Sequence, residues 1–343
     1  MNIIPELPSE TEKRGWQQAV ARYAQADVWA SVWQLINTLV PYFGLWALMA
    51  YTVHISYWLT LVLAIPTAGF MTRTFIIFHD CGHGSFFKSA RANDAVGIIT
   101  GILTLTPYYS WRREHAIHHA TAGDLDRRGV GDVKTMTVQE YLAAPWWKKA
   151  AYRIFRNPLM MFTVGAFLVF TVAHRFPGQT DGKKERGSVL FTDLMLAILF
   201  GALVLLVGWR TFLLVEVPVV LFGTSVGVWL FYVQHNFDPT YWERHKQWEF
   251  VKAGFEGSSY YKLPGVLQWF SGNIGFHHIH HLSPKIPNYK LPKAYKENQI
   301  LHVPPMTILA SLSSLRMRLY DEERKIMVGW SALKRYSRKQ VTA

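Results

Sequence analysis

Histidine is the residue type whose spacing points to chemistry in this chain. Three clusters, HDCGH, HAIHH and HHIHH, contain nine of the fourteen histidines, and the HxxHH spacing of the second cluster repeats in the third, where His278 is an additional histidine. Neutral imidazole is the commonest side-chain ligand for iron, copper and zinc. Eight ligands are too many for one ion, so the clusters predict a site for two metal ions. The candidate ligands are His79, His83, His115, His118, His119, His277, His280 and His281.

Residues three and four apart share one face of a helix, so each cluster is predicted to be helical with its imidazoles pointing in one direction. His235, in FYVQHNF, is predicted to be the ninth ligand. His278 falls off the HxxHH face and is predicted either to support a ligand without binding metal itself or to be structural. Carboxylates often orient the second ring nitrogen of such ligands. The candidates are Asp80, Glu114, Asp124, Asp126 and Asp132. The isolated histidines are interpreted as interface anchors; these are His54, His174, His245 and His302.

The composition indicates a membrane protein with substantial polar parts. Hydrophobic residues make up 50% of the 343 residues and charged residues only 17%, against about 25% charged in soluble domains. The net charge of +13 suits an anionic membrane surface or an acidic protein partner. The positive charge lies between apolar stretches rather than on one basic helix, so we expect no nucleic-acid partner. The single cysteine, Cys81, excludes an internal disulfide, and residues 1–16 lack the apolar core of a signal peptide.

Two long apolar blocks are predicted to cross the membrane. Residues 28–78 contain one formal charge, Arg73, and residues 189–233 contain three, Asp193, Arg210 and Glu216. Each block has room for two spans of ~20–25 residues. We therefore predict two helical hairpins, with spans at about 29–53, 57–78, 189–208 and 211–233. Two shorter apolar runs, 95–106 and 159–172, are below the ~18 residues normally needed to cross and are predicted to lie at the interface.

Charge sidedness places all the histidine clusters on one side of the membrane. With four spans, 34 of the 36 lysines and arginines lie on one face, which the positive-inside rule identifies as cytosolic. The predicted fold is an all-α membrane protein with interfacial helices, in which residues 1–343 form a single domain. A cytosolic helical cap, from residues 79–188 and 234–343, would hold the dimetal site.

A metal transporter is the main alternative from another class. Transporters place their ligands near the bilayer midplane, on the spans. The predicted span interiors contain no histidine. Glu216, two residues before Pro218, is the only acid well inside a predicted span. The positions of the clusters therefore favour an enzyme whose metals lie just outside the hydrocarbon.

The three clusters, in this order and between two hairpins, resemble the histidine boxes of the membrane-bound fatty acid desaturase superfamily. The HDCGH form is similar to the acyl-lipid type, and the stretches HHATAGDLDRRGVGDVKTMTVQEY and EGSSYYKLPGVLQWFSGNIGFHHIHHLSPKIPNYKL also resemble family sequence. The resemblance covers about residues 40–300. It implies that the nine histidines hold two iron ions. It also implies that the enzyme uses dioxygen and two electrons to form a cis double bond in the acyl chain of a membrane lipid. An acyl hydroxylase, or a related diiron oxidase, is the alternative on the same scaffold.

The resemblance also implies partners and a location. The chain has no HPGG haem motif, so electrons are expected from an external ferredoxin, flavodoxin or b-type cytochrome. The protein is expected to be a multi-pass protein of a bacterial inner membrane. In the stearoyl-CoA branch an asparagine contacts a metal through water; Phe231 stands at that position here, and Asn236 or Asn273 is the candidate replacement. An apolar tunnel between spans and cap is expected to hold the acyl chain, with candidate walls Phe78, Phe86, Tyr108, Trp111, Trp269 and Phe276.

Overall fold

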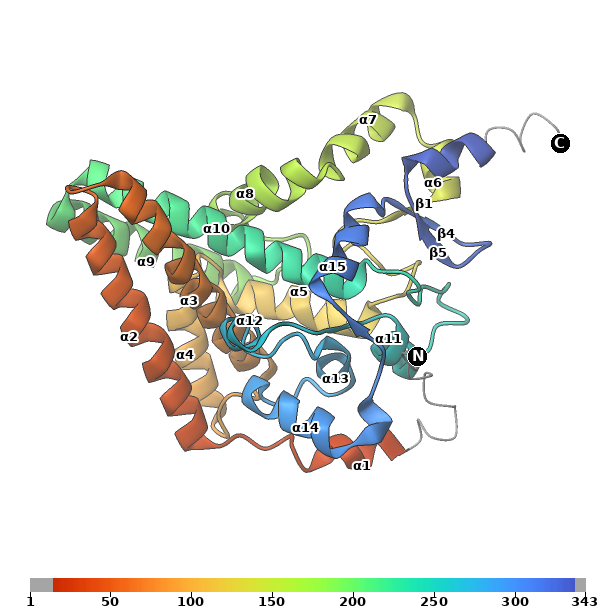
Figure 1. Ribbon diagram of the computed structural model, residues 1–343, viewed down its shortest axis with the longest axis horizontal. Coiled ribbons are helices and arrows are strands. Elements are labelled where there is room, and N and C mark those ends of the chain that lie inside the picture. The colour runs from red at the N-terminus through yellow and green to blue at the C-terminus, as the bar shows by residue number, and fades with distance from the viewer. Residues whose placement is uncertain (1–14, 337–343) are drawn as a thin grey trace.

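Four long helices form the body of the molecule (Figure 1). The structure is a computed structural model that describes residues 15–336; residues 1–14 of the polar N-terminus, expected to lack a signal peptide, lie outside this range. Each of the four helices is long and apolar enough to cross a membrane, which confirms the four predicted spans. They are α2 (Val28–Thr52), α3 (Tyr57–His83), α9 (Lys183–Val207) and α10 (Trp209–His235).

Local chemistry fixes where these helices begin and end. The Asp27 side chain caps α2 by accepting a hydrogen bond from the Ala30 amide at 2.9 Å. Gly208, with φ of +83°, makes the tight turn between α9 and α10, and Gly84, with φ of +64°, ends α3 in the left-handed conformation that favours glycine. The helix α3 therefore runs five residues past the predicted end at residue 78. The apolar pattern marks where the lipid-facing surface ends, and the helix itself continues to the glycine.

Large apolar side chains point outward from the spans. Leu205 is 89% exposed, Leu206 is 78% exposed and Trp58 is 79% exposed. Soluble proteins rarely expose contiguous apolar surface on this scale. A multi-pass membrane protein accounts for this surface, since the bilayer then covers it.

The two shorter apolar runs form helices that are not straight spans. The run 95–106 contributes to α4 (Ala90–Leu103), which packs against α3. The run 159–172 forms a π-helix, η2 (Met160–Gly165), followed by α8 (Ala166–Thr171) and the short η3 (Ala173–Arg175). The preceding helix α7 (Trp146–Phe155) meets this segment at an angle of 73°. Only if both halves of this bent pair count as one span does the number of spans become five.

The remaining elements form a cap at one end of the spans (Figure 1). Its longest helix is α5 (Tyr108–Thr121). The other helices are α1 (Trp16–Ala21), α6 (Val138–Ala143), α11 (Phe250–Glu256), α12 (Gly265–Phe270), α13 (His277–Leu282), α14 (Leu291–Glu297) and α15 (Ile308–Ser311). Single 3₁₀ turns complete it: η4 (Asn288–Lys290), η5 (Gln299–Leu301), η6 (Leu312–Arg316) and η7 (Trp330–Ala332).

Two small sheets interrupt the helical cap. The strand β4 (Leu319–Asp321) pairs parallel with β1 (Met136–Thr137) and antiparallel with β5 (Ile326–Val328). The strands β2 (Tyr260–Tyr261) and β3 (Pro305–Met306) pair in parallel. The prediction of a mostly helical protein is confirmed, but these sheets were missed. Strands of two or three residues are too short to show an alternating pattern.

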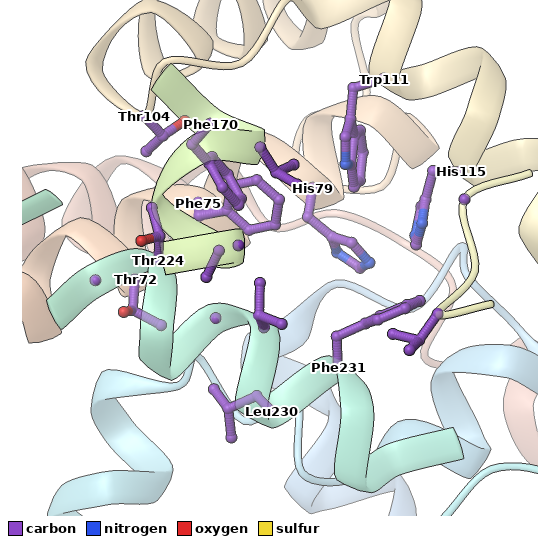
Figure 2. Close-up of a pocket in the computed structure, with 18 of the residues that line it drawn as sticks. Thr72, Phe75, His79, Thr104, Trp111, His115, Phe170, Thr224, Leu230 and Phe231 are labelled. Atoms are coloured by element: carbon purple, nitrogen blue, oxygen red, sulfur yellow. The ribbon is translucent and has the colours of Figure 1, made fainter. Parts of the chain in front are cut away.

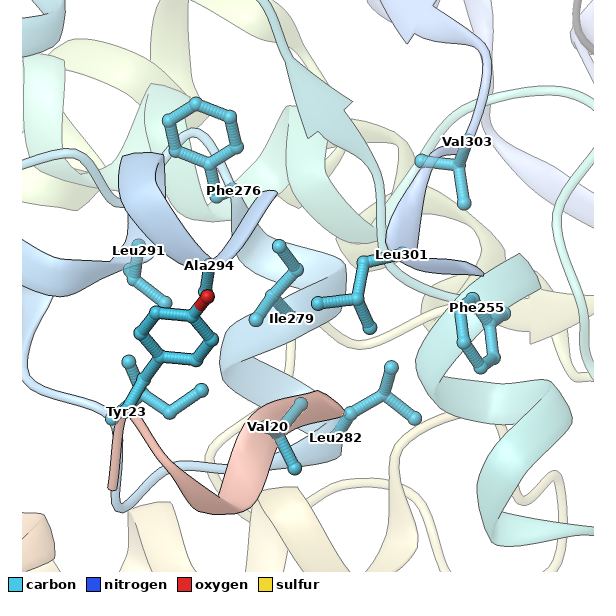
Figure 3. Packing of buried hydrophobic residues seen from close by; sticks show 11 residues of the cluster. Val20, Tyr23, Phe255, Phe276, Ile279, Leu282, Leu291, Ala294, Leu301 and Val303 are labelled. Atoms are coloured by element: carbon cyan, nitrogen blue, oxygen red, sulfur yellow. The ribbon is translucent and has the colours of Figure 1, made fainter. Parts of the chain in front are cut away.

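A hydrophobic core holds the short helix α13 in place (Figure 3). Ile279 and Leu282 turn outward from α13 and pack with Val20 of α1, with Tyr23, and with Phe255 of α11. A six-residue helix is not stable alone, so this packing supplies its stability. The histidines of α13 are thereby fixed on the opposite side, toward α3 and α5.

Candidate metal centre

Nine histidine side chains meet where the last turns of α3 and α10 reach α5 and α13. They form two groups, and within each group the candidate ligand nitrogens lie within 4.8 Å of one another. Eight of the nine side chains are buried and His83 is half-buried. The first group is His79, His83, His115, His119 and His280, and the second is His118, His235, His277 and His281.

The two HxxHH triplets divide between the groups. In α5, His115 and His119 belong to the first group and His118 to the second. In α13 the pattern is reversed, since His277 and His281 belong to the second group and His280 to the first. The prediction that each triplet points one way therefore needs correction. Adjacent helical residues diverge by about 100° around the axis, so each triplet contributes histidines to both groups.

The spacing of the ring nitrogens fits a bound metal. Nε2 of His277 lies 2.9 Å from Nε2 of His235, and Nε2 of His280 lies 3.0 Å from that of His119. The corresponding distance is 3.1 Å between His118 and His235, and 3.2 Å between His119 and His115. Bonds of about 2.1 Å from one ion to adjacent octahedral corners put the nitrogens about 3.0 Å apart.

Burial keeps these imidazoles ready to act as ligands. Desolvation, and next the charge of neighbouring histidines, lowers the pKa of His115 and His119 in α5 well below its usual value. The same causes lower the pKa of His277, His280 and His281 in α13. A neutral ring offers a lone pair to a metal. The buried Nε2 of His83 has no hydrogen-bond partner within residues 15–336, and a metal ion would satisfy it.

Outer partners fix the orientation of three of these rings. Nδ1 of His118 hydrogen-bonds to Asp132, and Nδ1 of His79 lies 3.2 Å from Asp80. Asp80 is itself held by the backbone amide of Asn288 at 2.6 Å. Nδ1 of His235 lies 3.3 Å from the Gly257 carbonyl. Such contacts set the tautomer and angle of a ligand ring.

The other predicted carboxylates lie elsewhere. Asp124 contacts His245 at 2.8 Å, and Asp126 pairs with Arg244 at 2.7 Å. Glu114 lines a cavity beside the site. Of the five candidates, Asp80 and Asp132 are therefore the ones that contact histidines of the two groups.

The structure also places the remaining predicted residues. His278 donates from Nε2 to the Leu301 carbonyl at 2.8 Å, which confirms its structural role. The Phe231 ring packs 5.1 Å from His118 and 5.2 Å from His235. Asn236 accepts from Arg156 at 3.3 Å, and Asn273 donates to the Asn288 carbonyl. Both asparagines thus have hydrogen-bond partners other than the histidines.

An apolar cavity of about 490 Å³ leads away from the histidines (Figure 2). His79, His115 and Trp111 lie at one end, and Thr72, Thr104 and Thr224 lie at the other. The threonine hydroxyls donate to carbonyls of their own helices, for example Thr72 to Ala68 at 3.0 Å. The wall is therefore effectively apolar despite these residues. This volume is typical of a site for a small ligand.

Helical spacing could have identified the cavity walls. Phe75 lies one turn before His79 in α3, and Gly227 and Phe231 lie two turns and one turn before His235 in α10. Of the six aromatic walls predicted, Trp111 lines the cavity and stacks on His115 at 4.3 Å. The other five pack into hydrophobic clusters or against neighbouring aromatic and cationic side chains; they are Phe78, Phe86, Tyr108, Trp269 and Phe276.

Comparison with known proteins identifies relatives over most of the chain. A sequence profile of the fatty acid desaturase family matches residues 56–307. A fatty acid desaturase of Bacillus subtilis (strain 168) is 50% identical over 316 residues, which is 92% of this chain and 90% of that protein. The sn-1 oleoyl-lipid 12-desaturase of Synechocystis sp. is 28% identical over 306 residues, covering 87% and 81%. A second Synechocystis protein, an sn-1 acyl-lipid omega-3 desaturase (ferredoxin), is 31% identical over 231 residues, covering 64% and 62%.

Proposed function

The chain belongs to the fatty acid desaturase family of oxidoreductases, and we propose that it introduces a cis double bond into the acyl chain of a membrane lipid. The observation that carries this proposal is the meeting of nine histidines, in two groups, with one end of an apolar cavity. The relatives named for acyl-lipid substrates support the lipid as substrate. We further propose that residues 1–343 act as one domain.

The nine histidines are proposed to hold two iron ions, one in each group. When bound, the iron pair would supply the activation of dioxygen that breaking two unactivated C–H bonds requires. The protein's part is to position the ligands. Asp132 and Asp80 hold the rings of His118 and His79 at fixed angles, and Trp111 covers the flat face of His115.

The cavity is proposed to bind the acyl chain and to exclude water from it. Phe75, Phe170 and Phe231 form the walls between the histidines and the far threonines. An extended hydrocarbon gains ~0.8 kcal/mol for each methylene that leaves water. A chain held along these walls would present one pair of methylenes to the histidine end, so the position of the double bond would follow from the cavity's length.

Electrons are proposed to come from a separate acidic carrier such as a ferredoxin, which one relative carries in its name. The distribution of lysine and arginine supports a cytosolic position for the cap and, with it, for the metal site. Oppositely charged surfaces accelerate such encounters, and salt weakens them. We propose the inner membrane of a bacterium as the location.

Expression in a host that lacks desaturases tests the proposed function. We expect new mono- or diunsaturated acyl chains, identified by mass spectrometry as a loss of two hydrogens; a gain of one oxygen would instead identify a hydroxylase. His118→Ala and His280→Ala remove one ligand from each group and should abolish the product while the protein stays in the membrane. Retained desaturation in either variant would refute the metal assignment.

A further inference from the structure

The cavity reaches the surface of the molecule at one apolar segment and also at Gly131. Four of its lining residues are exposed: Phe155 by 41%, Met160 by 37%, Val169 by 43%, and Gly131. The first three lie on α7, η2 and α8, which follow one another in the chain. The cavity thus has an opening between residues 155 and 169.

This opening lies in a surface that suits lipid. Around it Leu159 is 73% exposed, Val164 is 47% exposed and Leu168 is 45% exposed, and they do not line the cavity. At the start of α7, Trp146 and Trp147 are 79% and 55% exposed. The same helix carries Lys148, Lys149 and Arg153. Exposed tryptophans beside basic residues on an amphipathic helix are typical of the membrane interface.

The opening coincides with the break in the helix. Phe155 is the last residue of α7 and Met160 the first of η2, and the two halves meet at 73°. The Asn157 side chain accepts hydrogen bonds from the amides of Leu159 and Met160, at 3.0 and 3.3 Å, and so satisfies backbone groups that the break frees. Arg156 is fully buried at the bend and donates to the Tyr232 hydroxyl at 3.0 Å, which anchors the bend to α10. The bend is thus built into the structure.

We propose that the acyl chain enters the cavity sideways from the bilayer, through a mouth between Phe155 and Met160. This inference rests on the proposed function and narrows its substrate to an acyl chain still attached to a membrane glycerolipid. The headgroup would stay at the interface beside α7 while one chain passes through the break. Near Gly131 the cavity is lined by two carboxylates, Glu114 and Asp132, which would repel an anionic water-soluble carrier.

Variants with one added cysteine can test the mouth directly, because the natural Cys81 is buried. Met160→Cys places a thiol at the opening, and Leu159→Cys places one on the adjacent exposed residue that does not line the cavity. Each variant is modified with methanethiosulfonates of increasing size. It is then placed in vesicles of phosphatidylethanolamine and phosphatidylglycerol that carry a diazirine in one acyl chain.

Photolysis should label the peptides that contain Phe75 and Phe231 in the unmodified protein. An aromatic adduct at Met160→Cys should reduce this labelling about tenfold, because it occupies the proposed mouth, whereas the same adduct at Leu159→Cys should change it by less than about twofold. Equal labelling of the two modified variants would refute the proposed mouth. So would efficient labelling by a soluble diazirine acyl thioester while Met160→Cys is blocked.

This readout does not depend on turnover. If lipid labelling is blocked at Met160→Cys but the wild type forms no double bond in cells, the mouth stands and the proposed function fails. If desaturation occurs but both adducts leave labelling unchanged, the proposed function stands and the mouth fails.

Discussion

His278 is as deeply buried as the histidines on either side of it, yet its ring has another role. Its Nε2 donates to the Leu301 carbonyl at 2.8 Å, which uses that nitrogen. His277 and His281 instead turn their Nε2 atoms toward each other at 3.1 Å. Two neutral imidazoles at this distance can share only one proton, so the nitrogens of a whole group need a cation to be satisfied. The partner of Nε2, and not the burial of the ring, therefore distinguishes the structural His278 from the candidate ligands His277 and His281.

Asp132 provides a test of how the second group is held. Replacing Asp132 with Asn keeps the size of the side chain but removes the carboxylate that orients His118. We expect the affinity of the second group for iron to fall about 10- to 100-fold, while the first group keeps its ion. Iron content per chain, measured during titration with a chelator, should fall in two separated steps.

The matched control is Asp126→Asn, because that exposed carboxylate pairs with Arg244 and lies outside both groups. A loss of both ions together in Asp132→Asn, or an equal loss in the control, would contradict the role given to Asp132.

The sequence predicted which histidines gather but not how they divide. Repeated spacing identified the two triplets, and the apolar pattern placed His235 at the end of a span. The choice of Asp132 over Asp124 depends on the path of the loop between α5 and β1, where each carboxylate meets a different part of the cap. Local spacing carries no information on that path.

At the scale of the elements, α3 and α10 act both as membrane spans and as supports for the site. Each helix continues without a break from the bilayer-facing region to its histidine ligands. The helix face that carries His79 or His235 therefore also lines the cavity one or two turns earlier. A prediction based on apolar blocks divides each helix at the edge of the hydrocarbon and therefore misses this continuity. The bend at η2 was also missed, because a π-helix and an α-helix share nearly the same apolar pattern.

Gly227 of α10 should help to set the length of chain that the cavity accepts. It lines the cavity, and a Cβ built on it meets no atom of residues 15–336 within 4 Å. Gly227→Val would therefore occupy cavity space without straining its neighbours. We expect the longest accepted acyl chain to be desaturated roughly tenfold more slowly, in line with the ~1–3 kcal/mol cost of overpacking, with shorter chains less affected.

The product profile from lipids of mixed chain length checks this expectation. Gly201→Val in α9 is the control, since it also lies in open space on a span but does not line the cavity. An unchanged profile in Gly227→Val would show that the acyl chain does not pass this wall.

Arg156 should be a main support of the bend. Its guanidinium donates to the Met317 carbonyl at 3.0 Å, to the Tyr232 hydroxyl at 3.0 Å and to Asn236 at 3.3 Å. Arg156→Met would remove these three buried hydrogen bonds from a charged group, at ~1–3 kcal/mol each. We expect the free energy of unfolding in detergent to fall by about 3 kcal/mol.

Thermal and denaturant unfolding, followed by tryptophan fluorescence, measures the loss. Arg153→Met is the control, because Arg153 is exposed on the same helix and donates to the Tyr141 hydroxyl at 2.7 Å. Its effect should stay within about 1 kcal/mol. Equal losses in both variants would mean that Arg156 does not support the bend more than a surface arginine does.

At the scale of the whole molecule, the metal site lies between two environments. The apolar cavity connects it to the lipid-facing surface at Phe155 and Met160. On another side His83 is half-buried, and its carbonyl accepts a hydrogen bond from the exposed Lys285 at 2.7 Å. Composition and charge sidedness predicted one lipid face and one basic face. They could not show which histidine comes nearest the surface, because that depends on how α13 and the chain after it fold back against α3.

We expect Lys285 to contact the electron donor, because it is exposed and donates to the carbonyl of His83. A second exposed cation, Arg112, also lies within electrostatic range of His83. Lys285→Glu should raise the KM for an acidic ferredoxin about fivefold at low salt, because it replaces an attraction with a repulsion. The difference should shrink toward 1 M salt, where the screening length falls from about 10 Å to about 3 Å. Lys293→Glu is the control, since Lys293 is exposed on α14 and pairs with Glu297 instead.

Reduction by dithionite separates docking of the donor from a structural effect on the site. If Lys285→Glu also desaturates more slowly than the wild type when dithionite supplies the electrons, Lys285 acts by holding His83 in place and not by receiving the donor.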